Sequence, residues 1–335
     1  MEIWTTQETA PLSERELPQK TEKTAAIRTL SFALLTLTLV TVAFEYKSTE
    51  LPVEPRTAVA SPAVAAEKIF ADLSHSAKSA IVIDLKDNAT LYAYNPDVQL
   101  PLASLVKIPL ALVVSEVLSP DTIVTIPRDT APQGSIERLA KGEKWRIQDI
   151  IDFTLVASSN AGAEILAEAA DSAIRARYPD APAGSAAVWR MNDVARELGL
   201  THTYFLNVSG LDESTTLSGA YGSARDIATL YAYAVSSSQS SIFNETAESG
   251  IILKSSNGKG RTVAYNTNEA VRDIPGLIMG KTGITDLAGG NLAVVFDVAP
   301  AHPVVAVVLG STREGRFKDM KQLVERARQI ISMER

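Results

Sequence analysis

The sequence predicts a mixed α/β (α+β) fold, in which one antiparallel sheet is assembled from both ends of the folded region around an inserted helical lobe. Two β-rich runs, 79–85 and 90–95, lie near the start of that region. Three more, 275–284, 291–299 and 302–310, lie near its end, and the residues between the two groups have mostly helical patterns. The lobe is therefore expected between the second and third strands, with a cleft between lobe and sheet.

The elements are expected in the order of one helix, two strands, several helices, three strands and one helix. The first helix is expected over 65–75. In the lobe, 147–170 and 223–235 are the clearest helical segments, and Ser223 with Asp226 forms a capping box at the second one. The last helix has a single apolar stripe made of Phe317, Met320, Leu323, Val324, Ala327, Ile330 and Ile331.

Composition excludes several classes of function. The net charge is -7 and no run of basic residues occurs, so nucleic acid is not expected as a partner. The chain has no cysteine, which excludes disulfides, thiolate metal sites and cysteine nucleophiles. Its only histidines, His75, His202 and His302, are not spaced for metal binding, and each is expected at the surface. We therefore expect neither a metal nor another cofactor.

The N-terminal region contains a long apolar segment, Ala25–Phe44, with a single charge. About 20 apolar residues suffice to span a bilayer, and basic residues are more frequent before this segment than after it. The sequence therefore predicts a cytoplasmic tail (1–24), an uncleaved signal-anchor helix (25–45), an extracytoplasmic linker (46–66) and a catalytic domain (67–335). A cleaved signal peptide is the alternative interpretation.

A serine and a lysine interrupt the apolar segment PLASLVKIPLAL, which spans 101–112. In a helix that starts near Ala103, Ser104 and Lys107 would project from the same face. An apolar environment lowers the pKa of a lysine, so its neutral amine can take a proton from a serine hydroxyl. Ser104 is therefore a candidate nucleophile and Lys107 a candidate base. Pro109 is expected to disturb this helix one turn past Lys107.

The spacing of Ser104 and Lys107 is not specific by itself. Ser256 and Lys259 have the same spacing in SSNGKG, whose composition is that of a loop, and this second match is interpreted as chance. More information comes from two further motifs. ASSN places Ser158 and Asn160 after an amphipathic helix, and GKTG lies within a β-rich run and contains Lys281, Thr282 and Gly283.

Together these motifs resemble the SxxK, SxN and KTG set of penicillin-binding proteins and class A β-lactamases. The wider resemblance, over about 67–335, is to the serine D-alanyl-D-alanine carboxypeptidases of peptidase family S11, which trim bacterial peptidoglycan stem peptides. It includes GEKWRIQDIIDFTLVASSN, MNDVARELGLTHTYFLNVSGLD, SARDIATLYAYA, NTN and GKTGITDLAGGNLAVV. Ala161 and Ile284 depart from the family pattern, in which an Asp and an aromatic residue or histidine are common. The implied fold is β-lactamase/transpeptidase-like.

The resemblance implies a role for each catalytic residue. Ser104 would attack the carbonyl of the penultimate D-alanine, and Lys107 would accept the proton of its hydroxyl. Ser158 would relay a proton to the departing nitrogen, and Asn160 would orient Lys107 and the substrate amide.

The resemblance also implies how substrate is held. Lys281 and Thr282 would bind its terminal carboxylate, and the strand edge at Gly283 would pair with its backbone. The backbone N–H groups of Ser104 and Ile284 would form an oxyanion hole. The implied partners are stem peptides ending in D-Ala-D-Ala, β-lactams as covalent inhibitors, and the cytoplasmic membrane of a bacterium, with the catalytic domain on its outer side.

Two alternatives remain open at this stage. A class A-like β-lactamase shares the motifs but needs a glutamate that activates water, and the candidate segment Glu213–Thr216 lacks the asparagine expected three residues after the glutamate. An inactive cell-wall-binding module would hold a stem peptide in the same cleft without cutting it. Asn207 and Gly210 are interpreted as a structural turn near the cleft.

Overall fold

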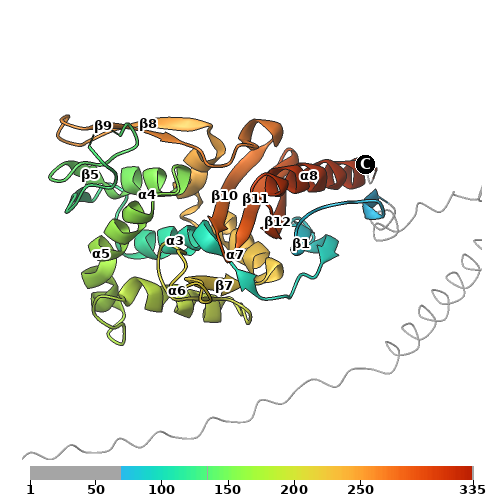
Figure 1. Ribbon diagram of the computed structural model, residues 1–335, viewed down its shortest axis with the longest axis horizontal. Coiled ribbons are helices and arrows are strands. Elements are labelled where there is room, and N and C mark those ends of the chain that lie inside the picture. The colour runs from blue at the N-terminus through green and yellow to red at the C-terminus, as the bar shows by residue number, and fades with distance from the viewer. Residues whose placement is uncertain (1–68, 134, 334–335) are drawn as a thin grey trace, which may run out of the picture. The chain divides into compact units, whose positions relative to one another are not determined.

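The computed structural model describes residues 69–133 and 135–333. Its main sheet has five antiparallel strands in the order β10-β11-β12-β1-β2 (Figure 1). The strands are β1 (Ser79–Asp84), β2 (Ala89–Tyr94), β10 (Leu277–Thr285), β11 (Gly289–Ala299) and β12 (His302–Ser311). Because β12 pairs with β1, the early hairpin joins the three late strands, which confirms the predicted sheet built from both ends of the folded region.

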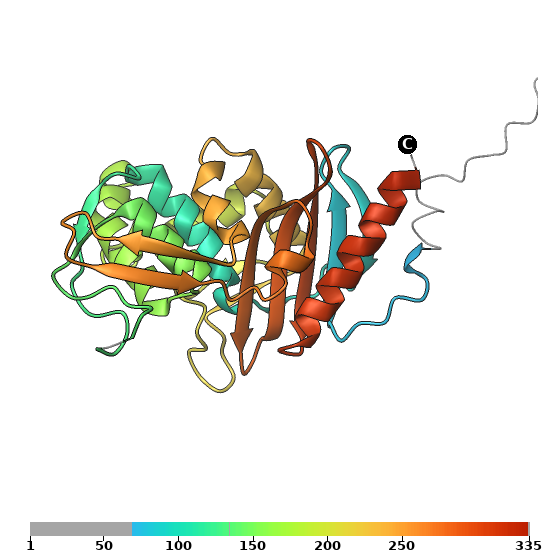
Figure 2. The same cartoon turned by 90° about the horizontal axis from the view of Figure 1, so that it is seen from above.

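Helices cover both faces of this sheet. Helix α8 (Gly315–Met333) lies along one face, and α7 (Ala224–Ser236) packs on the other (Figure 2). Along β12, residues such as Val304 and Val308 pack in the cluster that contains α8, while Val305 and Val307 pack in the cluster that contains the helical lobe. The late strands are near-continuous apolar runs because neither of their faces is left to water.

The helical lobe is built around α3 (Lys107–Val117), which follows the 3₁₀ turn η1 (Ala103–Val106). Its residues from Lys107 to Val114 are all buried. Helices α4 (Ile147–Val156), α5 (Asn160–Arg177) and α6 (Ala186–Glu197) pack around it. A helix that is apolar on every side needs such a covering, and this is why α3 lies at the centre of the lobe.

Several short elements lie outside the main sheet and the principal helices. Strands β3 (Leu100–Pro101), β7 (Ala220–Gly222) and β6 (Tyr204–Phe205) form a small sheet in the order β3-β7-β6. Strands β4 (Ile123–Thr125) and β5 (Lys144–Arg146) form a second, and β8 (Gly250–Lys254) and β9 (Arg261–Tyr265) a third. The remaining 3₁₀ helices are η2 (Ser240–Ala247) and η3 (Val271–Asp273). Most of these strands are too short to produce a periodic pattern, so the sequence did not predict them.

Three local expectations differ from the structure. Of the helix predicted over 65–75, the described part is helical only at Ile69 and Phe70 and turns at 71–72. Pro109 leaves α3 intact, because the helix begins at Lys107 and first-turn N–H groups need no helical partner. His302 is buried, not exposed. Its ring can be buried because Nε2 has a hydrogen-bond partner, a carboxylate oxygen of Asp84 at 2.7 Å.

The single-pass membrane location expected from the sequence is not supported by the structure and is corrected. Within 69–133 and 135–333, no helix is both long and apolar enough to cross a bilayer. Helix α3 is apolar but has 11 residues, against the roughly 20 needed for a span. The predicted anchor at 25–45 lies outside the described residues, as do the predicted tail at 1–24 and linker at 46–66.

A buried asparagine attaches the sheet to the segment before Ser104. The Nδ2 atom of Asn291 in β11 donates to the carbonyl of Pro101 at 2.9 Å. Its Oδ1 atom accepts from the N–H of Gly310 in β12 at 2.8 Å. The side chain thus fixes β3 against the late strands, and so sets where the following serine lies.

Replacing Asn291 by Ala is expected to lower the free energy of unfolding by about 2 kcal/mol, because the Pro101 carbonyl and the Gly310 N–H lose a buried partner. Denaturant unfolding of the full chain measures this change. Lys318→Ala, on the exposed side of α8, is the control and should stay within about 0.5 kcal/mol of wild type. Equal losses in the two variants would contradict the linking role of Asn291.

Candidate active site

Ser104 and Lys107 lie on a tight turn at the start of the central helix. The turn begins at Ala103, whose φ of 49° is in the left-handed region. In the 3₁₀ geometry of η1, residues three apart stand one above the other, so the two side chains meet. The Lys107 Nζ donates to the Ser104 Oγ at 2.7 Å. The predicted pairing of this serine with this lysine is therefore present in the structure.

The Lys107 amine is buried among three oxygen acceptors and has no carboxylate partner. Besides Ser104, it donates to Asn160 Oδ1 at 2.8 Å and to the carbonyl of Ser209 at 2.6 Å. The residue is 0% exposed, and this burial lowers the pKa of its amine to about 7. A lysine with such a pKa is partly neutral at neutral pH, as a proton acceptor must be.

Ser158 lies in the connection between α4 and α5. Its φ of 57° places it in the left-handed region, and its Oγ accepts from the Lys281 Nζ at 2.7 Å. The helix-capping role belongs to its neighbour Ser159, whose Oγ accepts from the N–H of Gly162 at 3.1 Å. Ser158 is thus free of a capping role, and Asn160, the first residue of α5, contacts Lys107.

The KTG motif lies on β10, an edge strand of the main sheet. Lys281 is 1% exposed, and besides Ser158 it donates to the carbonyl of Thr282 at 3.0 Å. Burial, and then the nearby charges of Lys107 and Arg316, hold its pKa well below the usual range. At Gly283 a Cβ would lie 2.7 Å from the Leu102 carbonyl oxygen, so only glycine lets β10 pass this close to the Ser104 turn.

These elements enclose a cavity of about 330 Å³. The side chains that line it come from the Ser104 turn, the Ser158 connection, the start of α5, β10, α8 and three loops. They are Ser104, Ser158, Asn160, Leu211, Thr267, Glu269, Thr282, Ile284, Thr285, Arg313 and Arg316. Of the predicted site residues, Ser104, Ser158, Asn160, Thr282 and Ile284 line this cavity, whereas Lys107 and Lys281 are buried behind two of its serines.

Arg316 is a cavity residue that the sequence analysis did not single out. It comes from α8, is 4% exposed, and donates from Nη1 to the carbonyl of Gly283 at 2.8 Å. Its buried Nε has no hydrogen-bond partner among the described residues. In the sequence it is one of several basic residues of the last helix, and nothing there separates it from the others.

The Ser209 carbonyl is the second contribution that the sequence did not reveal. It is presented by a turn in which Asn207 Oδ1 accepts from the N–H of Gly210 at 2.7 Å. Gly210 has a φ of 77°, and a Cβ there would lie 2.1 Å from the Ala103 carbonyl oxygen. The structural turn expected at Asn207 and Gly210 is therefore the one that brings an acceptor to Lys107.

Glu213, the glutamate considered for a β-lactamase, belongs to the same loop. Its Oε1 accepts from Asn207 Nδ2 at 2.6 Å, and it does not line the cavity. Its carboxylate is therefore used to hold the loop together.

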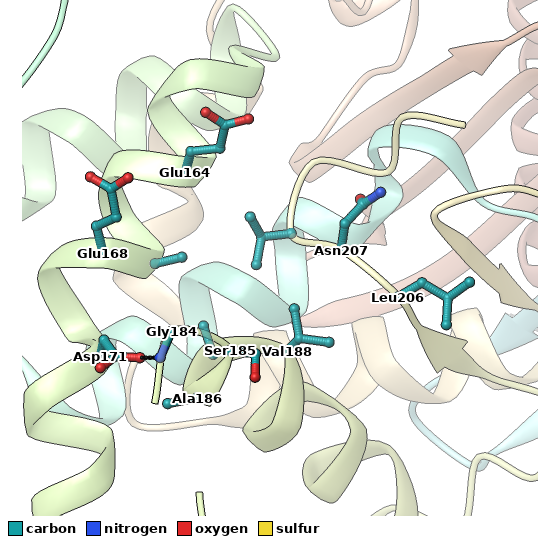
Figure 3. A pocket seen from close by; sticks show the side chains of 12 residues that line it. Glu164, Glu168, Asp171, Gly184, Ser185, Ala186, Val188, Leu206 and Asn207 are labelled. Atoms are coloured by element: carbon teal, nitrogen blue, oxygen red, sulfur yellow. Dashed lines mark hydrogen bonds between the residues drawn. The ribbon is translucent and has the colours of Figure 1, made fainter. Parts of the chain in front are cut away.

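A larger cavity, of about 530 Å³, lies between α5 and α6 and contains no predicted catalytic side chain (Figure 3). Glu164 and Glu168 on its wall pair with Arg128, and Asp171 accepts from Arg175 and from the N–H of Gly184. Its carboxylates thus already have partners. Within 69–133 and 135–333, no group of three His, Asp or Glu side chains is placed to hold a metal ion.

The fold is of the transpeptidase-like class, and its candidate site brings a serine and a buried lysine into hydrogen-bonding contact. Residues 64–313 match the family model of D-alanyl-D-alanine carboxypeptidase, Peptidase_S11, and the chain belongs to this family. The structure is similar to penicillin-binding protein D2 of Listeria monocytogenes in its ampicillin-bound form, with a TM-score of 0.63 and 27% identity, over 76% of this chain and 98% of the other.

Two curated relatives have similar identities. D-alanyl-D-alanine carboxypeptidase DacF of Bacillus subtilis is 27% identical over 77% of this chain, and this chain spans 64% of its length. D-alanyl-D-alanine carboxypeptidase DacB2 of Mycobacterium tuberculosis is 29% identical over 71% of this chain and 77% of its own. Neither the β-lactamase nor the inactive-module alternative is favoured by these comparisons.

The left-handed backbone of Ser158 predicts a measurable strain. Ser158→Gly and Ser158→Ala both remove the hydroxyl, but only glycine adopts this backbone without a steric penalty. The glycine variant is therefore expected to be about 1 kcal/mol more stable than the alanine variant in denaturant unfolding. An alanine variant as stable as the glycine variant would show that the backbone is not strained at this position.

Proposed function

We propose that the chain is a serine hydrolase that removes the C-terminal D-alanine from peptidoglycan stem peptides through an acyl-enzyme on Ser104. The observation that carries the proposal is the 2.7 Å hydrogen bond between Ser104 and a buried lysine whose pKa is lowered to about 7. Membership of the carboxypeptidase family supports the reaction class. Residues 67–335 are proposed as the catalytic unit, and the family match over 64–313 supports that assignment.

In the acylation step, Ser104 Oγ forms a bond to the carbonyl carbon of the penultimate D-alanine while its proton passes to the neutral Lys107 amine. The carbonyl oxygen becomes an oxyanion beside the backbone N–H groups of Ser104 and Ile284. The close packing of β10 against the turn of Ser104 supports this assignment. A Cβ at Gly283 would lie only 3.2 Å from the Ser104 nitrogen, so the strand and the turn lie side by side.

Collapse of the tetrahedral intermediate breaks the bond between the carbonyl carbon and the leaving nitrogen. The nitrogen needs a proton, and the Ser158 hydroxyl, which faces the same cavity, is proposed to deliver it while taking up the proton that Lys107 accepted from Ser104, so that Lys107 and Ser158 both return to their starting forms. Lys281 lies 2.7 Å behind Ser158 and supports this relay by donating to the serine oxygen. Water then attacks the acyl-enzyme, releases the shortened peptide and restores Ser104.

The terminal carboxylate of the substrate is proposed to bind at Thr282 and Arg316. Both line the cavity, and the buried Arg316 Nε lacks a partner that a carboxylate oxygen would provide. Lys281 was expected to make this contact from the sequence. Its burial behind Ser158 favours an indirect contribution, through its charge and its hydrogen bond to that serine.

β-lactams are proposed as covalent inhibitors that acylate the same serine. The ampicillin-bound form of the similar Listeria protein supports this proposal. In a β-lactam the leaving group stays tethered after ring opening, and the loop glutamate Glu213 is held by Asn207 instead of facing the cavity. A slowly hydrolysed adduct is therefore expected.

The first test is the release of D-alanine and the formation of a penicillin adduct. Wild-type chain should release D-alanine from an acyl-D-Ala-D-Ala peptide and gain about one penicilloyl mass in intact-mass spectrometry. Ser104→Ala should lose both properties, because no other hydroxyl receives a hydrogen bond from Lys107 among the described residues. Ser256→Ala, in the turn between β8 and β9, is the matched control and should keep both.

Three results would contradict the proposed function. An adduct on Ser104→Ala would place the nucleophile elsewhere, and rapid catalytic turnover of the penicillin by wild type would favour a β-lactamase. Absence of D-alanine release by a wild-type chain that still forms the adduct would favour the inactive cell-wall-binding module.

The pKa of Lys107 predicts the pH dependence of acylation. Only the neutral amine accepts the Ser104 proton, so the second-order acylation rate should rise with pH through a midpoint near 7. At two pH units below the midpoint, the rate should be roughly a hundredfold lower, because about 1% of the lysine is neutral there.

Asn160→Asp is the matched variant for this pH profile. It would place a carboxylate beside the Lys107 amine, stabilise its charged form and move the midpoint to higher pH. Stopped-flow acylation by a reporter cephalosporin gives both profiles. A midpoint that is the same in wild type and Asn160→Asp would exclude Lys107 as the titrating base.

A further inference from the structure

A second threonine stands directly behind the threonine of the KTG motif. Thr267 Oγ1 lies 2.6 Å from Thr282 Oγ1, and both side chains line the cavity that contains Ser104. The two residues come from different segments, since Thr267 follows β9 and Thr282 lies on β10. At this separation one hydroxyl donates its proton to the other.

The backbone around Thr267 is held in place from both sides. Its own N–H donates to the carbonyl of Val156, the last residue of α4, at 3.1 Å. The preceding residue, Asn266, donates from Nδ2 to the carbonyls of Thr246 and Glu248 at 2.9 and 2.8 Å. Asn266 Oδ1 also accepts from the N–H of Asn268 at 2.8 Å. The Thr267 hydroxyl is thus presented to Thr282 from a fixed position.

A carboxylate bound to Thr282 would fix the direction of the hydrogen bond between the two threonines. A carboxylate only accepts hydrogen bonds, so Thr282 can bind it only by turning its single proton into the cavity. The Thr282 oxygen then needs a donor on its other side, and Thr267 is 2.6 Å away. The chain Thr267 O–H to Thr282 O–H to carboxylate satisfies all three groups, and hydrogen bonds in such a chain strengthen one another.

We propose that Thr267 is a positioning residue for carboxylate recognition, which directs the Thr282 proton toward the terminal carboxylate of the bound substrate. This inference rests on the proposed function, because it assumes that Thr282 receives that carboxylate. The Arg316 guanidinium lines the same cavity and supplies positive charge, whereas Thr267 fixes the direction of the Thr282 hydroxyl proton. Without Thr267, the Thr282 hydroxyl keeps its place but loses the donor that fixes its orientation.

The test compares a ligand with a carboxylate against the same ligand without one. Benzylpenicillin and its methyl ester are expected to acylate the same serine, and they differ in this group alone, a charged carboxylate in one and a neutral methyl ester in the other. The second-order rate of adduct formation on the full chain is measured for both by intact-mass spectrometry, and their ratio is the acid preference. Thr267→Val removes the hydroxyl at nearly constant volume, and Thr267→Ser retains it.

Thr267→Val is expected to reduce the acid preference about tenfold, which corresponds to about 1.4 kcal/mol, while its rate with the ester stays close to wild type. Thr267→Ser should keep the acid preference within about twofold. Thr262→Val is the control, because it also removes a buried threonine hydroxyl, bonded to the Ile136 carbonyl outside the cavity, and should keep the wild-type ratio.

Each outcome supports or overturns a defined statement. An unchanged acid preference in Thr267→Val, or an equal loss of rate with acid and ester, would overturn the positioning role of Thr267 and leave the proposed function intact. A wild-type chain without acid preference would overturn the carboxylate site at Thr282 and this inference with it. Failure to release D-alanine, with the acid preference still dependent on Thr267, would overturn only the proposed function.

Discussion

The candidate active site depends on the burial of one amine, that of Lys107. Its three hydrogen-bond acceptors belong to segments far apart in the sequence, the turn of Ser104, the start of α5 at Asn160 and the loop at Ser209. Because no carboxylate is among them, burial is not compensated by an opposite charge and the pKa falls to about 7. Ser104 and Asn160 are thus held around a single buried amine, whose charged form is disfavoured by burial.

The lowered pKa of Lys107 requires that water be excluded from its amine, and the position of Lys107 on α3 provides this exclusion. Lys107 is the first residue of a helix whose next residues are all buried, so its side chain cannot reach water along the helix surface. Lys281 on β10 is buried in the same way, and the nearby charge of Lys107 adds to burial in lowering the pKa of Lys281. Arg316 keeps a guanidinium at the edge of the same region, where a carboxylate ligand would offset it.

The reacting groups themselves lie at irregular positions between rigid elements. The turn of Ser104 begins at a left-handed Ala103, and Ser158 has a left-handed backbone between α4 and α5. Each of these conformations costs free energy, which the packing of the surrounding elements offsets. Near Ala103, the hydrogen bonds of Asn291 also hold the preceding segment in place. At these positions the hydroxyls of Ser104 and Ser158 line the cavity, each with a lysine amine hydrogen-bonded to it.

The sequence by itself determined the sheet strands, the principal helices and the residue types of the site, because apolar periodicity and short motifs are local properties. Ser104, Lys107, Ser158, Asn160 and the KTG strand were all predicted in this way. Tertiary structure alone decided that Lys281 lies behind Ser158, that Arg316 enters the cavity, and that the Ser209 carbonyl and the Thr267 hydroxyl complete it. A backbone carbonyl has no signature in the sequence, and one arginine among several on a helix has none either. They contribute only when the fold brings the last helix and the segment after β9 within hydrogen-bonding distance of the KTG strand, and the loop at Ser209 within that distance of Lys107.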